Sequence, residues 1–584
     1  MTSDAFLGIS SSLGGRRWVG PSADVERVGA GIAQVHDLPE IVGRILATRG
    51  VAADDAPDYL APTLKSLMPD PSTLADMDRA AALLVEMATA RKRIAIFGDY
   101  DVDGGASSAL LVDWLRALDL NATVYIPDRI DEGYGPNDEA MRALAKAHDL
   151  IICVDCGTLS HGPVAAAVAA GAQVVIADHH MAGETLPECA AVVNPNRHDD
   201  DSGMGHLCAA GVVFMLLVAA NRILRANNGP QPNLMNALDL VALATVADVA
   251  PLIGVNRAFV RQGLKIMAAR ERPGLRALAD VAGVAAMPNS FHLGYLLGPR
   301  VNAGGRIGKA DLGARLLSTA SVEEASGIAH ELDRLNAERR AIEAEVLALA
   351  MEQAETRDIE GPLVWAAGDG WHPGVVGIVA ARLKEAFNRP AVVIGLDGEI
   401  GKGSARSVEG VDLGAAIATC AREGALIKGG GHQMAAGLTV AQTGVEAAMA
   451  RLSELLAKDL SLMTGPRSLR IDGALSPAAA TAELVEMLEA AGPFGAAAPA
   501  PRFVIPHARV AFAKRAGEDH LRLTLEGDGG GRLDAICFRA FSGPLGPFLS
   551  ETHGARVHVA GRLEIDDWGG RRKAKLKVED AAPA

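Results

Sequence analysis

Three apolar segments of this chain end in aspartate, namely Ile94-Ala-Ile-Phe-Gly-Asp-Tyr-Asp-Val-Asp-Gly104, Leu150-Ile-Ile-Cys-Val-Asp155 and Ala172-Gln-Val-Val-Ile-Ala-Asp-His-His180. Helical stretches separate them, and short apolar runs in that pattern predict the parallel strands of a βαβ sheet. Ligands of such sheets gather at the carboxyl ends of the strands. We therefore expect the polar residues at these ends to surround one crevice; they are Asp99, Asp101, Asp103, Asp155, Asp178, His179 and His180.

This set of side chains predicts a metal site. Carboxylates packed together repel one another unless cations neutralise them. Oxygen and imidazole donors suit Mn²⁺ or Mg²⁺, whereas structural thiolate sites favour zinc. An Asp-x-Asp-Gly segment alone would more often be a solvated turn, because turns favour Asp and Gly. Together with the other two strand ends, it favours a phosphoester hydrolase with two Mn²⁺ or Mg²⁺ ions. Asp178 is expected to orient a histidine.

A further carboxylate is expected from residues 236–249, an apolar helix stopped by Pro251. Asp239 and Asp248 are nine residues apart, about 900° around the helix axis, and so lie on opposite faces. Only one of them can face the metal site, and the spacing does not choose between them. Because this helix is apolar on all sides, neither acid is expected to be buried without a partner.

Composition limits the functions available to the chain. Its 584 residues indicate several domains, and 49% hydrophobic residues suffice for packed cores. With a net charge of -15, it lacks the overall basic character of most nucleic-acid-binding proteins, so any such binding needs local positive charge. Six scattered cysteines favour a reduced, cytoplasmic setting. We see no signal-peptide pattern and no uninterrupted apolar run of about 18 residues, and expect no membrane partner.

Changes in sequence pattern predict a multidomain α/β protein. We expect an N-terminal segment that clasps the next domain, a parallel-sheet α/β domain, a long connecting helix, a second α/β lobe and a C-terminal β-barrel. Their expected bounds are 1–80, 81–320, 321–360, 361–460 and 466–584.

Glycine-rich stretches in both α/β domains carry polar residues that could hold phosphate. Gly298 to Arg306 is interpreted as a loop with two arginines suited to bidentate phosphate contacts, and a charged surface loop is an equal alternative. Backbone N–H groups of glycine loops in the second lobe could form anion nests, although tight packing turns would look the same. The candidate residues are Arg300, Arg306, Ser404, Arg406, Gly430, Gly431 and His432.

Lysines alternate with apolar residues near the C-terminus. Lys573, Lys575 and Lys577 would therefore share one face of a strand. We favour a face that tracks a single nucleic-acid strand. The alternative is an edge strand that lysines protect from aggregation.

Eight motifs together resemble the DHH phosphoesterase superfamily and, within it, bacterial exonucleases specific for single-stranded DNA. The resemblance covers nearly the whole chain and places an OB-fold at its C-terminus. The motifs are Gly98-Asp-Tyr-Asp-Val-Asp-Gly104, Gly133-Tyr-Gly135, Val154-Asp-Cys-Gly157, Asp178-His-His180, Thr245-Val-Ala-Asp-Val249, Leu297-Gly-Pro-Arg-Val-Asn-Ala303 with Gly305-Arg306, Trp371-His-Pro-Gly-Val-Val-Gly377 and Gly430-Gly-His432.

The resemblance also implies a function and residue roles. It implies 5′-to-3′ degradation of single-stranded DNA in repair and recombination, with a single-strand-binding protein and a helicase as expected partners. The implied catalytic residues are Asp155, as a bridging ligand, His180, Arg300, Arg306 and His432, of which the arginines and His432 hold phosphates. DNA contacts are expected from Arg300, Arg306, Ser404, Arg406, Gly430, Gly431, His432, Lys573, Lys575 and Lys577. The implied metal ligands are Asp101, Asp103, Asp155, His179, His180 and Asp248.

Two alternatives compete with this function. A hydrolase of short oligonucleotides, cyclic dinucleotides or pyrophosphate would share the superfamily's metal site, but such relatives usually lack an OB-fold and are shorter. A non-enzymatic replication scaffold would be expected to have lost metal ligands, whereas all six are present here.

Overall fold

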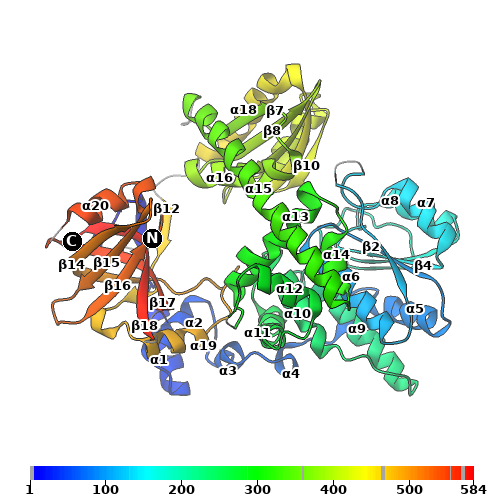
Figure 1. Ribbon diagram of the computed structural model, residues 1–584, viewed down its shortest axis with the longest axis horizontal. Coiled ribbons are helices and arrows are strands. Elements are labelled where there is room, and N and C mark those ends of the chain that lie inside the picture. Colours follow the sequence, from blue (N-terminus) through cyan, green and yellow to red (C-terminus); the bar gives the residue numbers. More distant parts are fainter. Residues whose placement is uncertain are drawn as a thin grey trace. The chain divides into compact units, whose positions relative to one another are not determined.

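The computed structural model describes residues 5–129, 132–285, 287–357, 361–461, 467–552, 554–566 and 572–584 (Figure 1). The chain divides into two compact units. The barrel unit comprises Met1–Pro69, Val249–Gln262 and Gly465–Ala584, and the two-lobe unit comprises Asp70–Asp248 and Gly263–Thr464.

The first lobe of the two-lobe unit contains a five-stranded sheet in which every strand is parallel to its neighbours, in the order β3-β2-β4-β5-β6. Strands β2 and β4 are buried along their whole length, which explains their continuous apolar sequences. The predicted parallel sheet is thus confirmed. The strands are β2 (Ile94–Gly98), β3 (Ala122–Tyr125), β4 (Leu150–Val154), β5 (Gln173–Ala177) and β6 (Ala191–Val193).

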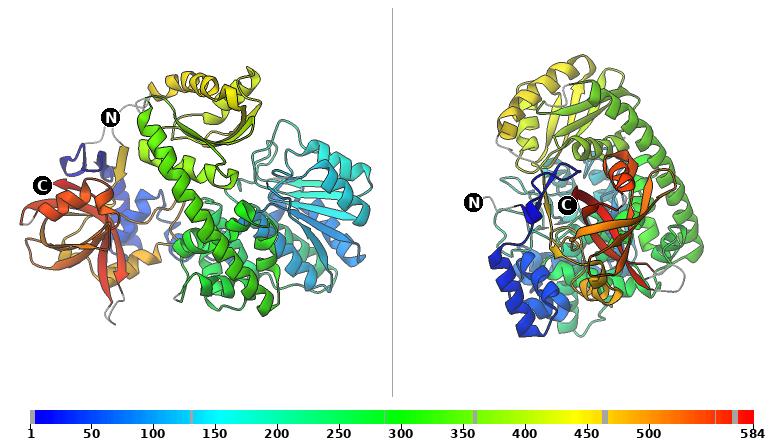
Figure 2. Two further views of the ribbon diagram at one scale, coloured as in Figure 1. Left: turned by 45° about the horizontal axis from the view of Figure 1, so that its top comes forward. Right: turned by 90° about the vertical axis from the view of Figure 1, so that its left-hand side faces the viewer.

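Helices connect these strands and continue into a helical layer (Figure 2). The first set is η2 (Pro71–Thr73), α5 (Met77–Thr89), α6 (Val102–Arg116), α7 (Asp138–Ala147), α8 (His161–Ala169) and α9 (Ala209–Ala226). The second set is η3 (Met235–Ala237), α10 (Leu238–Ala247), α12 (Pro273–Val281), the π-helix η4 (His292–Leu297), α13 (Gly298–Ile307) and α14 (Leu312–Ser318). Helix α11 (Gly254–Ala268) belongs to the barrel unit up to Gln262.

Helix α9 is the one described helix that is long and apolar enough to cross a membrane, by length and composition alone. It lies inside the first lobe, where 72% of its apolar window is buried and where it contacts α5 and α6. Its hydrophobicity is therefore that of a core helix.

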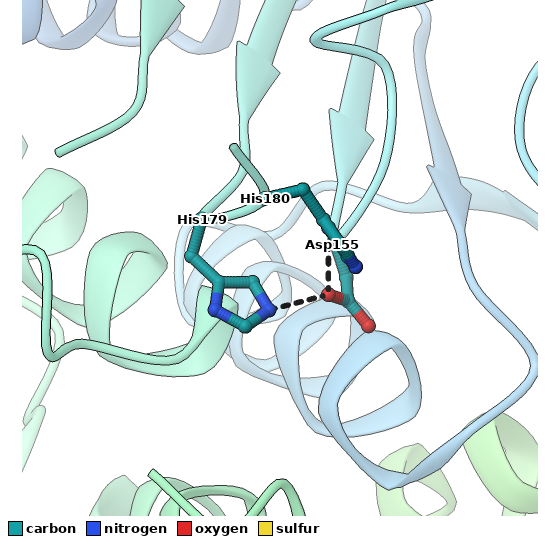
Figure 3. Close-up of side chains that lie close together, drawn as sticks. All are labelled: Asp155, His179 and His180. Carbon is teal, nitrogen blue, oxygen red and sulfur yellow. Dashed lines mark ion pairs between the residues drawn. The ribbon is translucent and has the colours of Figure 1, made fainter. Parts of the chain in front are cut away.

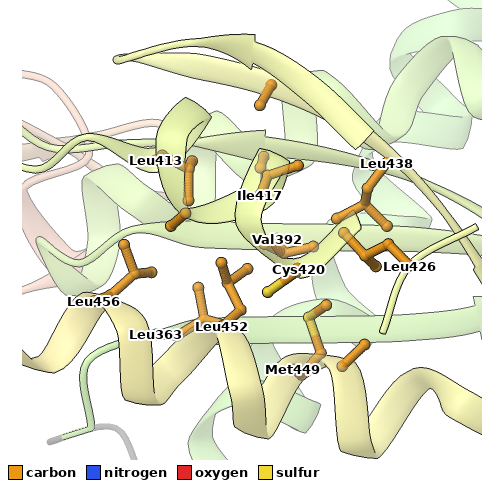
Figure 4. Close-up of a cluster of buried hydrophobic side chains, with 14 of the residues drawn as sticks. Leu363, Val392, Leu413, Ile417, Cys420, Leu426, Leu438, Met449, Leu452 and Leu456 are labelled. Carbon is orange, nitrogen blue, oxygen red and sulfur yellow. The ribbon is translucent and has the colours of Figure 1, made fainter. Parts of the chain in front are cut away.

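The long helix predicted from the sequence is α15 (Val322–Thr356), which is followed by the second lobe. This lobe has a mixed sheet in the order β10-β11-β9-β8-β7, where only β7 and β8 are parallel. Side chains of α17 and α18 pack on side chains from one face of the sheet, such as Val392 and Leu438, and together they form the core in Figure 4. The elements are β7 (Val364–Asp369), α16 (Pro373–Phe387), β8 (Ala391–Asp397), β9 (Ile400–Arg406), α17 (Leu413–Arg422), β10 (Lys428–His432), β11 (Ala435–Ala441), η5 (Gln442–Gly444) and α18 (Val445–Ser461).

The glycine-rich segments of this lobe are strands and not the loops expected from the sequence, while anion binding by them stays a prediction. Their glycines make room for neighbouring elements. A Cβ at Gly403 would lie 2.8 Å from Leu438 Cδ1, and one at Gly429 would lie 2.7 Å from Ile417 Cγ2. Close packing of α17 and of adjacent strands therefore accounts for these two glycines.

The barrel unit contains a closed five-stranded β-barrel, as predicted. β14 pairs with both β15 and β17, while β18 lies between β16 and β17 and completes the ring. Its C-terminal elements are β12 (Arg467–Arg470), β13 (Gly473–Ala474), η6 (Pro477–Ala479), α19 (Ala482–Ala490), β14 (Phe503–Ala516), β15 (His520–Glu526), β16 (Arg532–Cys537), η7 (Ala540–Ser542), α20 (Leu545–Glu551), β17 (Arg556–Asp566) and β18 (Lys573–Pro583).

The N-terminal segment belongs to the same compact unit as this barrel, and its expected role as a clasp on the next domain stays a prediction. β1 pairs in parallel with β12, and the buried Trp18 donates from Nε1 to Asp580 Oδ2 at 3.0 Å. Ser12 donates to the same oxygen at 2.6 Å. The segment contains η1 (Phe6–Gly8), β1 (Arg16–Val19), α1 (Ala23–His36), α2 (Glu40–Thr48), α3 (Ala56–Leu60) and α4 (Leu64–Leu67).

Candidate active site

Asp99, Asp101 and Asp103 are held where β2 passes into α6. Asp101 caps this helix, since its Oδ1 accepts from the backbone N–H of Asp103 at 2.8 Å and of Gly104 at 3.2 Å. A Cβ on Gly104 would lie 2.5 Å from the backbone nitrogen of Asp99, so only glycine allows the helix to begin this close to the strand end. The Asp-x-Asp-Gly sequence thereby places three carboxylates at one edge of the sheet.

The carboxylate of Asp103 is buried against the start of α9. Its two oxygens accept from the backbone N–H groups of Ala209 at 2.6 Å and Ala210 at 2.8 Å. The positive end of a helix dipole stabilises a negative charge in this position. α9 therefore fixes the orientation of Asp103 as well as filling the core.

Asp155 lies at the centre of the acidic residues. It follows β4 with a φ of 60°, a left-handed conformation that is uncommon for residues other than glycine. His179 Nε2 is 3.3 Å from Asp155 Oδ1, and His180 Nδ1 is 3.9 Å from the same oxygen (Figure 3). One carboxylate thus meets both histidines that follow β5.

Asp178 orients the second histidine. Its Oδ1 is 2.8 Å from His180 Nδ1, and its Oδ2 accepts from the hydroxyl of Thr158 at 2.7 Å. Burial opposes ionisation of Asp178, but the contacts with His180 and Thr158 outweigh it and lower the pKa of this carboxyl. The hydrogen bond to Asp178 also raises the pKa of His180 to about 9 against the opposing effect of burial. These contacts are those expected of a residue that orients a metal ligand.

The two aspartates of α10 lie on opposite sides, as their spacing predicts. Asp248, at the C-terminal end of the helix, has Oδ2 3.8 Å from His179 Nε2. Asp239 is buried elsewhere and accepts from Arg272 Nε at 2.9 Å. Neither acid is buried without a partner, and Asp248 is the one that faces the histidines.

The electrostatics of this cluster fit a divalent cation. Burial, followed by repulsion from neighbouring carboxylates, raises the pKa of Asp155 and Asp99 well above the ordinary value, and raises the pKa of Asp248 to about 8. Asp99 Oδ1 is buried and accepts no hydrogen bond from the described residues. The side chains form three groups with ligand atoms within 4.8 Å of one another: Asp155, His179 and His180; Asp103, His179 and Asp248; and Asp99, Asp101 and Asp155.

Arginines lie close to the acidic cluster. The guanidinium carbon of Arg129 is 5.2 Å from the ring centre of Tyr100, the residue between Asp99 and Asp101. Arg306 Nη1 donates to the backbone oxygen of Gly374 at 3.0 Å, which joins α13 to the start of α16. Burial, and then the charge of Arg129, lowers the pKa of Arg306 to about 10, so Arg306 stays cationic at neutral pH. The pKa of Arg406 is lowered by the same two causes.

Known proteins share these features over the whole chain. The DHH family N-terminal domain matches residues 93–245, the DHHA1 domain residues 360–458 and the RecJ OB domain residues 471–580. The chain is 36% identical over 570 residues to the single-stranded-DNA-specific exonuclease RecJ of Escherichia coli (strain K12), an alignment that covers 94% of this chain and 96% of that protein. The chain belongs to the RecJ family.

Solved RecJ structures have the same fold. The crystal structure of RecJ in complex with Mn²⁺ from Thermus thermophilus has a TM-score of 0.80 at 30% identity, covering 97% of this chain and 79% of that one. The Mg²⁺ complex from the same organism has a TM-score of 0.74 at 28% identity, covering 97% and 78%. The whole architecture, barrel included, is therefore that of the RecJ family.

The two arginines predicted to share a phosphate-binding loop are on a helix, and they diverge. Gly298 to Arg306 belongs to α13. The glycines of this helix allow close packing, since a Cβ at Gly305 would lie 2.8 Å from the backbone oxygen of Tyr100. Arg306 lies beside the acidic cluster. Arg300 instead pairs with Asp333 of α15 at 2.8 Å and donates to the backbone oxygen of Leu296, also at 2.8 Å. The structure thus supports a phosphate role for Arg306 more strongly than for Arg300.

The candidates in the second lobe also fall into two groups. Arg406 donates from Nη1 to Ser404 Oγ at 2.9 Å, and a Cβ at Gly377 of α16 would lie 3.0 Å from atoms of both residues. They therefore share the sheet face that α16 covers. Gly430, Gly431 and His432 lie on β10 at the sheet edge, where all three are exposed.

Sequence reasoning gave no role to three residues that the structure places at the site. Arg129 stands beside Tyr100, and its charge, after burial, helps to lower the pKa of His372 at the start of α16. The Tyr134 hydroxyl donates to the backbone oxygen of Asp155 at 3.0 Å and is 3.2 Å from His180 Nε2. Tyr134 and His372 belong to motifs that were recognised, Gly133-Tyr-Gly135 and Trp371-His-Pro-Gly374, but no spacing rule indicated Arg129.

Lys573, Lys575 and Lys577 project from β18 as the alternation predicts, while Ala574, Leu576 and Val578 are buried. β18 lies between β16 and β17, so the alternative of an edge strand is wrong. Acidic residues of β17 accompany the lysines, with Lys575 Nζ 3.1 Å from Asp566 and Lys577 Nζ 3.7 Å from Glu564. Part of the positive charge of this face is therefore already neutralised.

Proposed function

We propose that this protein is a metal-dependent exonuclease that hydrolyses the phosphodiester bonds of single-stranded DNA in the 5′-to-3′ direction, in repair and recombination. The main support is the group of four aspartates and two histidines at the carboxyl edge of the first sheet. Burial, followed by repulsion from neighbouring carboxylates, raises the pKa values of Asp155 and Asp248. Such a group needs divalent cations in order to be charged at neutral pH.

Two Mn²⁺ or Mg²⁺ ions would be held by Asp101, Asp103, Asp155, His179, His180 and Asp248. Bound ions of this kind make a water easier to deprotonate and neutralise charge that develops on the phosphate. Asp155 is the best candidate for a bridging ligand because it belongs to two of the three ligand groups. Asp178 and Tyr134 contact the two ring nitrogens of His180 and would fix the orientation of its ring.

The scissile phosphate and its neighbours would be held by Arg306, Arg406 and Arg129. Guanidinium groups form paired hydrogen bonds with phosphate oxygens and remain charged at neutral pH. Three such groups close together repel one another, and a phosphate relieves that repulsion. Ser404 extends the polar surface through its contact with Arg406. His432, Gly430 and Gly431 would contact the strand farther along β10.

The barrel would hold the strand that has not yet been cut, with Lys573, Lys575, Lys577 and the nearby Phe538 as contacts. A single-strand-binding protein and a helicase would supply single strands as partners of the enzyme. A cytoplasmic setting agrees with the six cysteines, all of which are free thiols.

Single strands labelled at either end, incubated with Mn²⁺ and separately with EDTA, test this function. We expect mononucleotides from the 5′ end with Mn²⁺ and none with EDTA. A duplex of the same sequence is the control and should resist degradation. Degradation from the 3′ end would contradict the polarity, hydrolysis of dinucleotides alone would indicate a short-oligonucleotide hydrolase, and no hydrolysis at all would indicate a scaffold.

A further inference from the structure

Two aromatic rings stand exposed on the π-helix η4 and the turn before it. Phe291 and Tyr295 stack with ring centres 5.1 Å apart and planes at 22°, and the residues are 53% and 71% exposed. Only 4% of the residues in this chain are aromatic. Leu293 and Leu297 are the buried residues that anchor the same helix. Both residues therefore leave much of their surface open to solvent, and burying such rings against a ligand would be favourable.

The helix that carries this aromatic pair packs against the end of α10, next to the acidic cluster. A Cβ at Gly294 would lie 3.4 Å from Val246 Cγ1, and one at Gly298 would lie 3.2 Å from Ala247 Cβ, so η4 rests on the last turn of α10. Asp248 is the next residue of that turn. The helix then continues without a break into α13, which carries Arg306. π-helical turns are rare and occur frequently at functional sites.

We propose that Phe291 and Tyr295 form a stacking platform for nucleobases of the DNA strand next to the acidic cluster. The proposal rests on the function proposed above and adds how bases, rather than phosphates, are bound. The metal ions and arginines of the proposed site would contact only the phosphate backbone of the DNA. A ring face stacks on any base, which gives affinity without sequence preference, as degradation of arbitrary strands requires.

The position of the pair favours DNA over a protein partner. The platform flanks the turn that ends in Asp248, so a strand whose phosphate reaches the cluster brings neighbouring bases to this helix. Tyr295 is the more exposed ring and should contribute more than Phe291.

Binding to a base-bearing and an abasic oligonucleotide separates stacking from backbone contacts. Fluorescence anisotropy with a labelled 12-nucleotide strand would be measured in EDTA, so that no strand is cut. Tyr295→Ala should weaken binding of the base-bearing strand by about 5- to 100-fold, the range for loss of one stacked base, and change binding of the abasic strand less than twofold. Tyr295→Trp should restore binding, and Leu349→Ala, at an exposed apolar residue of α15, is the control.

Equal effects on both strands would show that Tyr295 contacts the backbone, and no effect on either strand would favour a protein partner for the rings; both results would overturn the platform. Thermal melts of each variant check that the fold is retained, and Tyr295→Leu, which keeps an apolar side chain but has no ring, provides a milder variant if Tyr295→Ala unfolds. Degradation of end-labelled strands by the unaltered enzyme with Mn²⁺ tests the proposed function separately. Absence of that activity would refute the function, whereas activity without dependence on bases would refute only the platform.

Discussion

The two ends of helix α10 carry acidic residues in opposite electrostatic surroundings. At one end, Asp239 is buried against Arg272, which also contacts Asp113 at 2.7 Å, so one guanidinium serves both carboxylates and opposes the effect of burial, which raises the pKa of Asp239. At the other end, Asp248 faces His179 and further carboxylates, and its pKa is raised to about 8, first by burial and then by Asp103 and Asp101. The acids at the Asp239 end have an arginine as a partner, whereas the acids around Asp248 have no arginine or lysine partner among the described residues.

This difference distinguishes structural charge from charge that serves a ligand. Breaking a buried ion pair destabilises a fold because one partner remains charged and unpaired. A group of buried carboxylates without cationic partners already carries that cost, and a bound ion removes it. Substitutions at the two ends of α10, and at other charged groups of either kind, should therefore differ in whether they reduce stability or activity.

Loss of Asp155 should have the largest effect on activity. Asp155→Ala removes a carboxylate shared by two ligand groups, so nuclease activity should fall by at least about a thousandfold. The variant without metal should be as stable as the original protein or more stable, because repulsion in the cluster decreases. Rates with Mn²⁺ and melting temperatures with EDTA measure the two effects. Near-normal turnover at saturating Mn²⁺ would remove Asp155 from the site.

Asp248→Asn and Asp239→Asn should have opposite consequences. Asp248→Asn should lose activity and keep its stability. Asp239→Asn should keep most activity per folded molecule, yet lose about 3 kcal/mol of unfolding free energy, because Arg272 loses a buried partner. Urea denaturation and assays at matched concentrations of folded protein distinguish them. If Asp239→Asn lost activity and Asp248→Asn kept it, Asp239 and not Asp248 would face the metal site.

The two arginines of α13 extend the comparison to positive charge. Arg306→Ala should reduce kcat/KM by about 10- to 100-fold without loss of metal, because it removes a charged hydrogen-bond donor to phosphate. Arg300→Ala should reduce it less than tenfold, since Arg300 is paired with Asp333. Metal content of the purified variants is the control. A larger effect at Arg300 would mean that substrate breaks its ion pair and recruits it.

The sequence predicted those parts that depend on local patterns. Apolar runs ending in Asp gave the parallel strands, and helical spacing correctly separated Asp239 from Asp248. The glycine-rich segments were misjudged because glycine serves loops and close packing equally well; Gly305 and Gly403 allow neighbouring elements to approach. Arg129 and the pairing of β1 with β12 were not predicted, since contacts between residues distant in sequence leave no periodic trace.

Without metal, the stability of the two-lobe unit should fall as the pH rises. The pKa of Asp248 is about 8 in the folded protein and about 3.9 in the unfolded chain, so the folded state binds its proton more tightly. The stability gained from protonated Asp248 is fully present below about pH 4 and is lost as the pH approaches 8. Melting curves in EDTA should show it, and Asp248→Asn should weaken the pH dependence. Added Mn²⁺ should raise the melting temperature more at pH 8 than at pH 5, because the ion replaces protons. Equal effects of Mn²⁺ at both pH values would contradict the assignment.

The lysine face of β18 should have the smallest effect, because it resembles the paired end of α10. Each lysine that neutralises a phosphate of a single strand contributes about 0.7 to the slope of log affinity against log salt, so three would contribute roughly 2. Lys575 and Lys577 already have Asp566 and Glu564 as partners, so replacing all three lysines with alanine should flatten the slope by about 1 or less.

Glu564→Gln combined with Asp566→Asn is the matched test of that explanation. It releases two lysines without altering them, so the slope should become steeper and binding tighter at low salt. Titrations of a labelled single strand in EDTA at several salt concentrations measure both variants. A slope that changes in neither variant would show that the strand does not cross this face of the barrel. A change in the slope of about 2 in the triple lysine variant would show that DNA displaces the acidic partners of the lysines. Lysines in surface ion pairs would then still be available to bind DNA.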